Sequence, residues 1–132
     1  MINYDFIDTE AIAIDTEKKY DIVLSHSVFH YFKDLEYAKK TIVAMVEKSN
    51  NKIAIFDVND KSKEKEYHEI RMADMNEDEY KVKYTGLEHM FYDKGWFINI
   101  AKEFNLKIDI FNQSFNEYSN SKLRFNVIME KI

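Results

Sequence analysis

Residues Tyr20–Phe32 form the sequence Tyr-Asp-Ile-Val-Leu-Ser-His-Ser-Val-Phe-His-Tyr-Phe, from which the rest of the predicted fold follows. The unbroken apolar run Ile22–Leu24 is typical of a parallel strand that is covered on both faces. The run ends at Ser25, where small polar and imidazole side chains follow. In open α/β sheets the ligand crevice lies just beyond the carboxyl ends of the strands. The sequence therefore places a candidate site at Ser25, His26, Ser27 and His30.

The length and composition favour one globular domain, residues 1–132. Apolar residues make up 45% of the chain and charged residues 33%, which is ordinary globular usage. The formal net charge of −5 disfavours nucleic acid as a partner, because binding to phosphates needs a clustered basic face. The absence of cysteine excludes disulfides, thiolate nucleophiles and cysteine-ligated zinc.

The sequence shows no membrane segment and no export signal. No window reaches the ~20 apolar residues of a membrane span, and the first ten residues lack a basic start and a hydrophobic core. We therefore expect a cytoplasmic protein with no membrane partner. There is no proline, and the only glycines are Gly86 and Gly95, so the chain cannot form a glycine-rich nucleotide loop.

A strand–helix–strand unit follows from the sequence after His30. Asp34 is a good N-cap for a helix whose apolar residues recur at helical spacing, and Asn50 and Asn51 tolerate the left-handed conformation that ends helices. The apolar run Ile53–Val58 then predicts a second strand. A connection of this length indicates a parallel pair with a right-handed crossover.

Three polar residues, Asp57, Asn59 and Asp60, end this second strand. They either contact a ligand or cap the next helix, and the capping interpretation is favoured. The charge-rich segment Lys61–Tyr80 has a thin apolar stripe, which suits an exposed helix or a mobile lid.

The remaining segments predict a loop, a helix and two closing strands. Asp93 caps a helix with a heavy aromatic stripe, and Asn105 closes it. Period-two alternation then predicts two half-buried or edge strands that form an antiparallel pair. The loop is expected at Tyr84–Tyr92. The two closing strands are expected at Leu106–Ile110 and Leu123–Met129, on either side of the polar connection Asn112–Lys122. At the other end of the chain, Ile2–Ile7 is expected to form an early short strand.

The chain resembles the class I S-adenosylmethionine-dependent methyltransferases. The resemblance rests on the aromatic–Asp pair Tyr20-Asp21, which opens an apolar strand that ends in a small-residue, histidine-containing loop, and on the order of the elements. It implies an α/β fold with a three-layer, Rossmann-like methyltransferase sheet whose final strand is antiparallel. The chain resembles the later two-thirds of a class I methyltransferase. The resemblance therefore implies a truncated fold that lacks the glycine-rich first part of the cofactor site.

The resemblance also implies a cofactor, S-adenosylmethionine, and roles for named residues. Asp8, thirteen positions before Asp21, matches the acidic residue that binds the adenine amino group, and Thr9 adjoins it. Cofactor binding is implied for Ser25, His26 and Ser27 as well, which would line the methionine and reactive end. His30 or His89 would orient or deprotonate the acceptor, since imidazole titrates near neutral pH. Equally, Asp8 could simply end a strand, and the histidines could be structural.

Other chemistries have weaker support. His26 and His30 have a spacing that suits metal ligands on one helical face, but no glutamate lies between them, and no metal is predicted. Neither Ser25 nor Ser27 has the glycine neighbours of a hydrolase nucleophile. A nucleotide-binding oxidoreductase would also need the glycine loop. The aromatic rings of Phe29, Tyr31 and Tyr92 could face a sulfonium cation or pack in the core.

The sequence thus predicts a methyltransferase, or a fragment of one, that transfers a methyl group to an oxygen or nitrogen atom of a small-molecule acceptor. The alternative is a catalytically inactive remnant or a split-enzyme subunit. In that case the edge of the central strand would pair with another chain, either as a homodimer or with a companion chain that completes the sheet.

Overall fold

The computed structural model describes residues 7–73, 75–84, 89–113 and 121–132. In these parts of the chain the helices and strands are, in order, β1 (Tyr20–His26), α1 (Leu35–Lys48), β2 (Ser49–Asn59), α2 (Glu64–Met72), α3 (Glu77–Tyr84), α4 (Lys94–Glu103), β3 (Leu106–Asn112) and β4 (Arg124–Lys131). Short 3-10 turns lie at Ala11–Ala13, Phe29–Tyr31, Lys61–Lys63 and Ser121–Leu123. The predicted strand Ile2–Ile7 falls outside the described residues apart from Ile7, which is exposed.

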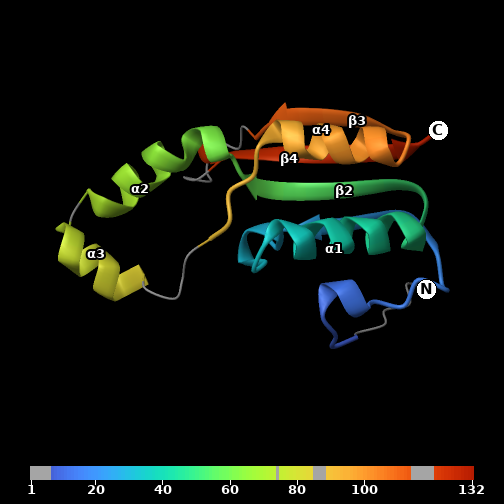
Figure 1. The fold of residues 1–132 in the computed structure, drawn as a ribbon, viewed down its shortest axis with the longest axis horizontal. Coiled ribbons are helices and arrows are strands. Elements are labelled where there is room, and N and C mark those ends of the chain that lie inside the picture. Colours follow the sequence, from blue (N-terminus) through green and yellow to red (C-terminus); the bar gives the residue numbers. More distant parts are fainter. Residues whose placement is uncertain (1–6, 74, 85–88, 114–120) are drawn as a thin grey trace, which may run out of the picture.

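The four strands form one mixed sheet in the order β1-β2-β4-β3 (Figure 1). β1 and β2 are parallel, with Val23 opposite Ile53 and Ser25 opposite Ile55. β4 is antiparallel both to β2 and to β3. The predicted parallel pair and the antiparallel final strand are therefore confirmed, and the carboxyl ends of β1 and β2 lie at the same edge of the sheet.

Helix α1 begins as its sequence predicts but ends differently. The Asp34 carboxylate accepts a hydrogen bond from the backbone N–H of Tyr37 at 2.7 Å, which satisfies a donor of the first turn. At the other end Ser49 already has extended backbone, and β2 begins there, four residues before the predicted Ile53. The prediction that Asn50 and Asn51 end the helix in a left-handed conformation is wrong, because both belong to β2.

Helices α1 and α4 pack on the same face of the sheet and share one core (Figure 1). The core is built from α1, β2, α4 and β4 side chains that include Ile42, Met45, Ile55, Phe97, Ile100, Phe125 and Val127. Asp93 precedes α4, although its side chain makes no cap hydrogen bond, and Asn105 ends the helix with a left-handed φ of 53° as predicted.

The opposite face of β1 is uncovered among the described residues. Ile22 and Leu24 are 57% and 59% exposed. The expectation that both faces of this strand are buried is therefore wrong: α1 covers the Val23 side, and no described helix packs on the other side. The described part of the chain thus contains the sheet and one helical layer of the expected three-layer fold.

The two closing strands differ in their burial. β3 is a half-buried edge strand, as the alternation predicts. β4 lies between β2 and β3, and its first five residues are buried or nearly so, so the half-buried prediction fails for this strand. The physical reason is that its polar residues Arg124 and Asn126 are turned to buried partners at the end of β2.

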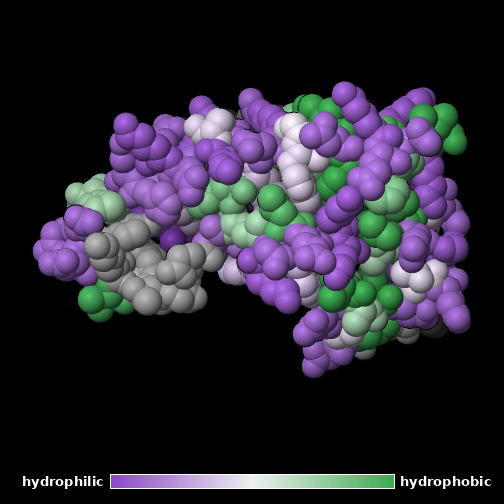
Figure 2. Space-filling model, viewed as in Figure 1, coloured by the Kyte–Doolittle hydropathy of each residue, from purple (hydrophilic) through white to green (hydrophobic). Residues whose placement is uncertain are grey.

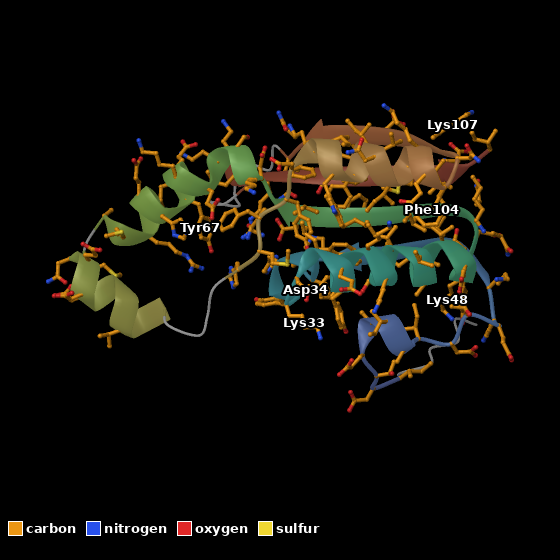
Figure 3. All side chains as sticks on the ribbon, in the orientation of Figure 1. Lys33, Asp34, Lys48, Tyr67, Phe104 and Lys107 are labelled. Atoms are coloured by element: carbon orange, nitrogen blue, oxygen red, sulfur yellow. The ribbon has the colours of Figure 1, made fainter. Side chains whose placement is uncertain are left out.

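The predicted helix or lid Lys61–Tyr80 is divided between α2 and α3, which extend away from the sheet (Figure 1). Tyr67 points from α2 toward the body of the molecule and is buried (Figure 3), whereas Ile70 on the expected apolar stripe is half exposed. Hydrophilic side chains dominate the visible surface of α2 (Figure 2). None of the helices in the described ranges is long and apolar enough to cross a membrane.

The segment before β1 is tied to the end of α1. Lys48 Nζ donates to the backbone oxygens of Asp15 at 2.5 Å and Lys18 at 3.1 Å. Lys19 Nζ also donates to the backbone oxygen of Glu47. These contacts hold residues 11–19 beside α1 and next to the exposed edge of β1.

Candidate functional site

Two residues with left-handed backbone meet where β1 and β2 end. Ser27 has a φ of 59° and Asp57 a φ of 64°, in a region that non-glycine residues rarely adopt. The Ser27 hydroxyl donates to Asp57 Oδ2 at 2.5 Å. Asp57 sits where the pairing of β2 with β4 shifts between Ile55 and Val58, so a bulge turns its side chain inward. Such conformations cluster at functional sites, where neighbouring contacts hold them in place.

The Asp57 carboxylate is the centre of a buried polar network. Arg124 Nη1 donates to Oδ2 at 3.1 Å, and Gln113 Nε2 donates to Oδ1 at 3.2 Å. The backbone N–H of Asp57 donates to Asn126 Oδ1 at 2.9 Å. Asp57 is 1% exposed and Arg124 5%, so each charge is compensated by the other out of water. The network links the ends of β1, β2 and β3 to the start of β4.

His26 and Ser27 adjoin this network on the solvent side. The His26 side chain is exposed, and its Nδ1 lies 2.9 Å from Ser27 Oγ. His26 ends β1, whereas His30 lies in the turn Phe29–Tyr31, so the two rings are not on one helical face. Within the described ranges no group of three or more metal-binding side chains occurs.

His30 is buried beneath the carboxyl edge of the sheet, with 4% of its surface exposed. Burial, together with the nearby Arg124 and His89, lowers the pKa of His30 from 6.5 to about 4. The imidazole is therefore neutral at pH 7. Its Nδ1 has no hydrogen-bond partner among the described residues.

His89 lies against His30, with ring centroids 4.8 Å apart, so the structure brings together the two predicted catalytic residues. Tyr67 from α2 lies within hydrogen-bond distance, with its hydroxyl oxygen 3.1 Å from His89 Nδ1. Burial and the positive charges of Arg71 and Arg124 lower the pKa of His89 as well. Helix α2 is thus connected directly to the histidine pair.

A hollow of about 310 Å³ opens beside β1, between this strand, α1 and the turn Ala11–Ala13. Ser25 and His26 line it, together with mainly apolar side chains. Ser25 Oγ is buried there without a hydrogen-bond partner among the described residues. Ala11 and Ile14 supply its outer wall, whereas Asp8 and Thr9 are exposed and outside the lining.

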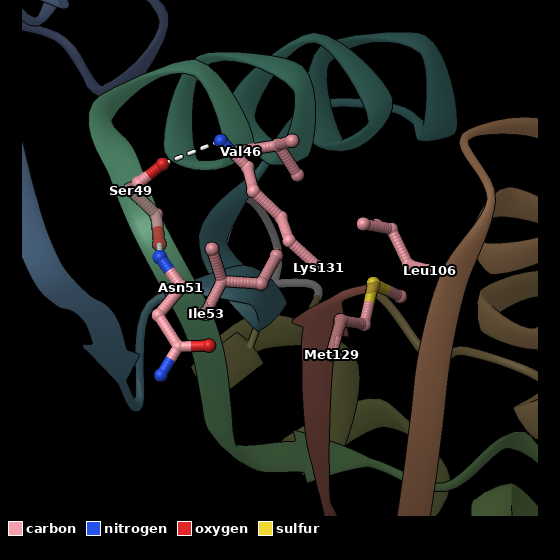
Figure 4. Close-up of a pocket in the computed structure, with 7 residues that line it drawn as sticks. All are labelled: Val46, Ser49, Asn51, Ile53, Leu106, Met129 and Lys131. Atoms are coloured by element: carbon pink, nitrogen blue, oxygen red, sulfur yellow. Dashed lines mark hydrogen bonds between the residues drawn. The ribbon is translucent and has the colours of Figure 1, made fainter.

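A second hollow, at the other end of the sheet, is closed to ligands. Lys131 and Ser49 border it, and Lys131 Nζ donates to the Ser49 backbone oxygen across its mouth (Figure 4). It contains no space that a water molecule could enter. It therefore offers no site.

Most of the other polar and aromatic candidates make structural contacts, whereas Tyr31 is exposed. Asp60 Oδ1 accepts from the N–H and hydroxyl of Ser62, which is the capping role, and Asn59 Nδ2 donates to the Met90 backbone oxygen at 3.0 Å. Tyr92 is fully buried, and burial raises the pKa of its hydroxyl, which donates to the Phe29 backbone oxygen at 2.8 Å. Phe29 is also in the core, although it borders the hollow.

Arg124, Gln113 and Asn126 belong to this polar network but are not among the site residues predicted from the sequence. The available signals were an acidic residue, Asp57, within an otherwise apolar strand, and an arginine opening the last strand. A buried carboxylate needs a partner, so a search for one would have pointed to Arg124.

The sequence matches no family model, and no curated protein matches it. Solved structures do match. Magnesium protoporphyrin IX methyltransferase (ChlM) from Synechocystis was crystallised with bound S-adenosylhomocysteine (SAH). It aligns at a TM-score of 0.59 and 13% identity, over 95% of this chain and 48% of that one. The N-methyltransferase NodS from Bradyrhizobium japonicum aligns at 0.53 and 13% identity over 93% and 57%. A possible histamine N-methyltransferase from Thermotoga maritima aligns at 0.55 and 10% identity over 94% and 62%.

These similarities show the fold. The chain has the fold of the class I methyltransferases in the part that it covers, which confirms the fold class that the sequence predicts. The chain spans about half the length of these structures.

Proposed function

We propose that this chain carries part of an S-adenosylmethionine-dependent methyltransferase, which acts on an oxygen or nitrogen atom of a small-molecule acceptor. One observation carries the proposal. The hollow lined by Ser25 and His26 lies at the carboxyl end of β1, in a sheet whose fold matches a methyltransferase crystallised both with SAH and with SAM. This is the edge at which open α/β sheets bind ligands.

The hollow fits part of such a cofactor. Its volume of about 310 Å³ is at the lower end of the ~300–1,000 Å³ usual for ligand pockets. The buried Ser25 hydroxyl lacks a partner among the described residues, which a polar ligand atom could supply. We assign Asp8 and Thr9 to the adenine end, since they precede Ala11 in the outer wall of the hollow.

The cofactor supplies an electrophilic methyl group, so the task of the protein is to hold the acceptor in line and to exclude water. We assign His30 and His89 to the acceptor. His30 stays neutral at pH 7 because its pKa is about 4, so its burial supports orientation of the acceptor rather than proton removal. Tyr67, near His89, would make α2 part of the acceptor side.

Calorimetric titration of the chain with S-adenosylmethionine and with S-adenosylhomocysteine (SAH) tests this function. We expect saturable binding of both, and about tenfold weaker binding in Ser25→Val, which removes a buried hydroxyl of the hollow. Ser62→Ala is the matched control, because Ser62 contacts Asp60 and does not line the hollow. Flat titrations with both ligands would contradict the proposal.

A second candidate function is association through β1. This strand pairs only with β2 among the described residues, and its exposed apolar side chains Ile22 and Leu24 adjoin an open sheet edge. Such an edge is a template for pairing with another chain. The chain would then act as one subunit of a larger assembly, either with a second copy or with a companion that completes the sheet.

Sedimentation velocity tests whether the chain associates through β1. We expect a concentration-dependent dimer that Leu24→Lys abolishes. Val82→Lys, on the exposed surface of α3, is the control that should leave association unchanged. A monomer at all concentrations, with no companion needed for ligand binding, would exclude the second candidate.

A further inference from the structure

Ser27 joins a buried carboxylate to an exposed imidazole. Its Oγ lies 2.5 Å from Asp57 Oδ2 and 2.9 Å from His26 Nδ1. A serine hydroxyl has one proton, so it can donate to only one of these partners and must accept from the other.

The surroundings of Asp57 decide the direction. Its two carboxylate oxygens already receive Arg124 Nη1 and Gln113 Nε2, and an ionised carboxylate can only accept. The Ser27 proton therefore points to Asp57, and the bond is charge-assisted, which agrees with its short length.

It follows that His26 donates to Ser27 from Nδ1–H. A neutral imidazole carries a single N–H, and the hydrogen bond that one nitrogen makes fixes the state of the other. Nε2 of His26 is then an unprotonated acceptor. No described residue forms a hydrogen bond with it, and the ring stands at the rim of the hollow beside β1.

The other polar side chains of the hollow do not fill this role. The Thr41 hydroxyl donates to the Tyr37 backbone oxygen at 3.0 Å, and the Ser25 hydroxyl is buried deeper. Among the described residues that line the hollow there is no carboxylate. His26 Nε2 is thus the exposed acceptor at this hollow that is best suited to a cationic donor.

We propose that Asp57 and Ser27 are positioning residues that hold His26 in its Nδ1–H tautomer, so that Nε2 accepts a hydrogen bond from a ligand ammonium group in the hollow. The assignment rests on the proposed function, under which that group is the α-ammonium of the methionine end of the cofactor. Neither Ser27, a predicted cofactor-binding residue, nor Asp57 is among the residues that line the hollow, so any effect of theirs on ligand binding would be exerted through His26.

Nitrogen-15 NMR of the histidine side chains in the ligand-free chain tests the tautomer. We expect the Nδ1–H form for His26, with the resonances assigned by their loss in His26→Gln. Ser27→Gly should abolish the preference, and glycine tolerates the left-handed φ of 59°, so the backbone is not strained. The Nε2–H form in the unmodified chain, or an unchanged tautomer in Ser27→Gly, would overturn the proposal.

Two probes then test the ammonium contact. SAH should shift the His26 Nε2 resonance, and 5′-S-(3-carboxypropyl)-5′-thioadenosine, which is SAH without its amino group, should not. Ser27→Gly should weaken SAH about tenfold and leave the desamino compound unchanged. Binding of SAH without a shift at Nε2 would overturn the contact. Absence of SAH binding would instead refute the proposed function. The tautomer of His26 would still be tested by the NMR measurement on the ligand-free chain.

Discussion

Arg124, the first residue of β4, donates from Nη1 to the Asp57 carboxylate at 3.1 Å, and the two side chains are 5% and 1% exposed. This buried pair connects the inner strand β4 to the bulged end of β2. Removal of one partner leaves the other charge buried and uncompensated, which is costly, even where a complete ion pair adds little net stability.

Replacement of Arg124 by leucine should therefore lower the free energy of unfolding by about 3–5 kcal/mol. Urea denaturation measures this loss, and adding Asp57→Asn to the same chain should restore part of it. Lys40→Met is the control, because Lys40 pairs with Glu36 at 3.2 Å on the exposed face of α1. It should change stability by less than about 0.5 kcal/mol. A loss in Arg124→Leu no larger than in the control would contradict the buried-pair account.

The free energy of unfolding should decrease as the pH is lowered, because the pKa of His30 is depressed in the folded state. Its pKa is lowered from 6.5 to about 4, so the unfolded state binds the proton more readily, and stability is complete above pH 6.5 and is lost toward pH 4. Between pH 8 and pH 5 this group should contribute a loss of about 2 kcal/mol. Denaturation of the unmodified chain and of His30→Gln at both pH values isolates this contribution. His68→Gln, at a more exposed histidine, is the matched control variant.

The contact between Tyr67 and His89 should restrain α2. Tyr67→Phe removes a hydroxyl that lies 3.1 Å from His89 Nδ1, at a cost of about 1 kcal/mol. Hydrogen–deuterium exchange of α2 amides should accelerate, while α1 and β2 stay protected. Tyr31→Phe is the control on an exposed ring. Equal exchange of α2 in both variants would exclude a restraining role.

The left-handed residue at the end of α4 gives a local test of backbone strain. Asn105 has a φ of 53°, which glycine adopts without cost and alanine does not. Asn105→Ala should destabilise the protein by about 1 kcal/mol, and Asn105→Gly should be neutral or slightly stabilising. Thermal unfolding of both variants provides the measurement, and an alanine variant as stable as the glycine variant would contradict the assigned conformation.

Local signals in the sequence were sufficient to predict most elements. The Asp34 cap, the helical stripe after it, the parallel pair of β1 with β2, and Asn105 as a helix end all follow from neighbouring residues. The start of β2 was missed because asparagine favours helix ends, whereas here pairing with β1 extends the strand back to Ser49. Tertiary pairing outweighed that local preference.

The site was harder to predict because its contacts are between distant segments. Ser25, His26 and Ser27 were predicted from the end of one strand, and His89 from a loop that the family resemblance places near the acceptor pocket. Arg124 and Asp57 meet only because β4 lies between β2 and β3, and the exposure of Ile22 and Leu24 depends on what covers β1. The acidic residue in an otherwise apolar strand indicates that Asp57 needs a partner, but neither relationship has a periodic signature in the sequence.

The central claim is that the hollow beside β1 binds the methionine end of a methyl donor. A crystal structure of the chain grown with SAH tests it most directly. We predict electron density for the amino-acid end of the ligand in this hollow, within contact of Ser25 and His26. A ligand bound elsewhere on the chain, or an empty hollow in crystals grown at a saturating SAH concentration, would contradict the account.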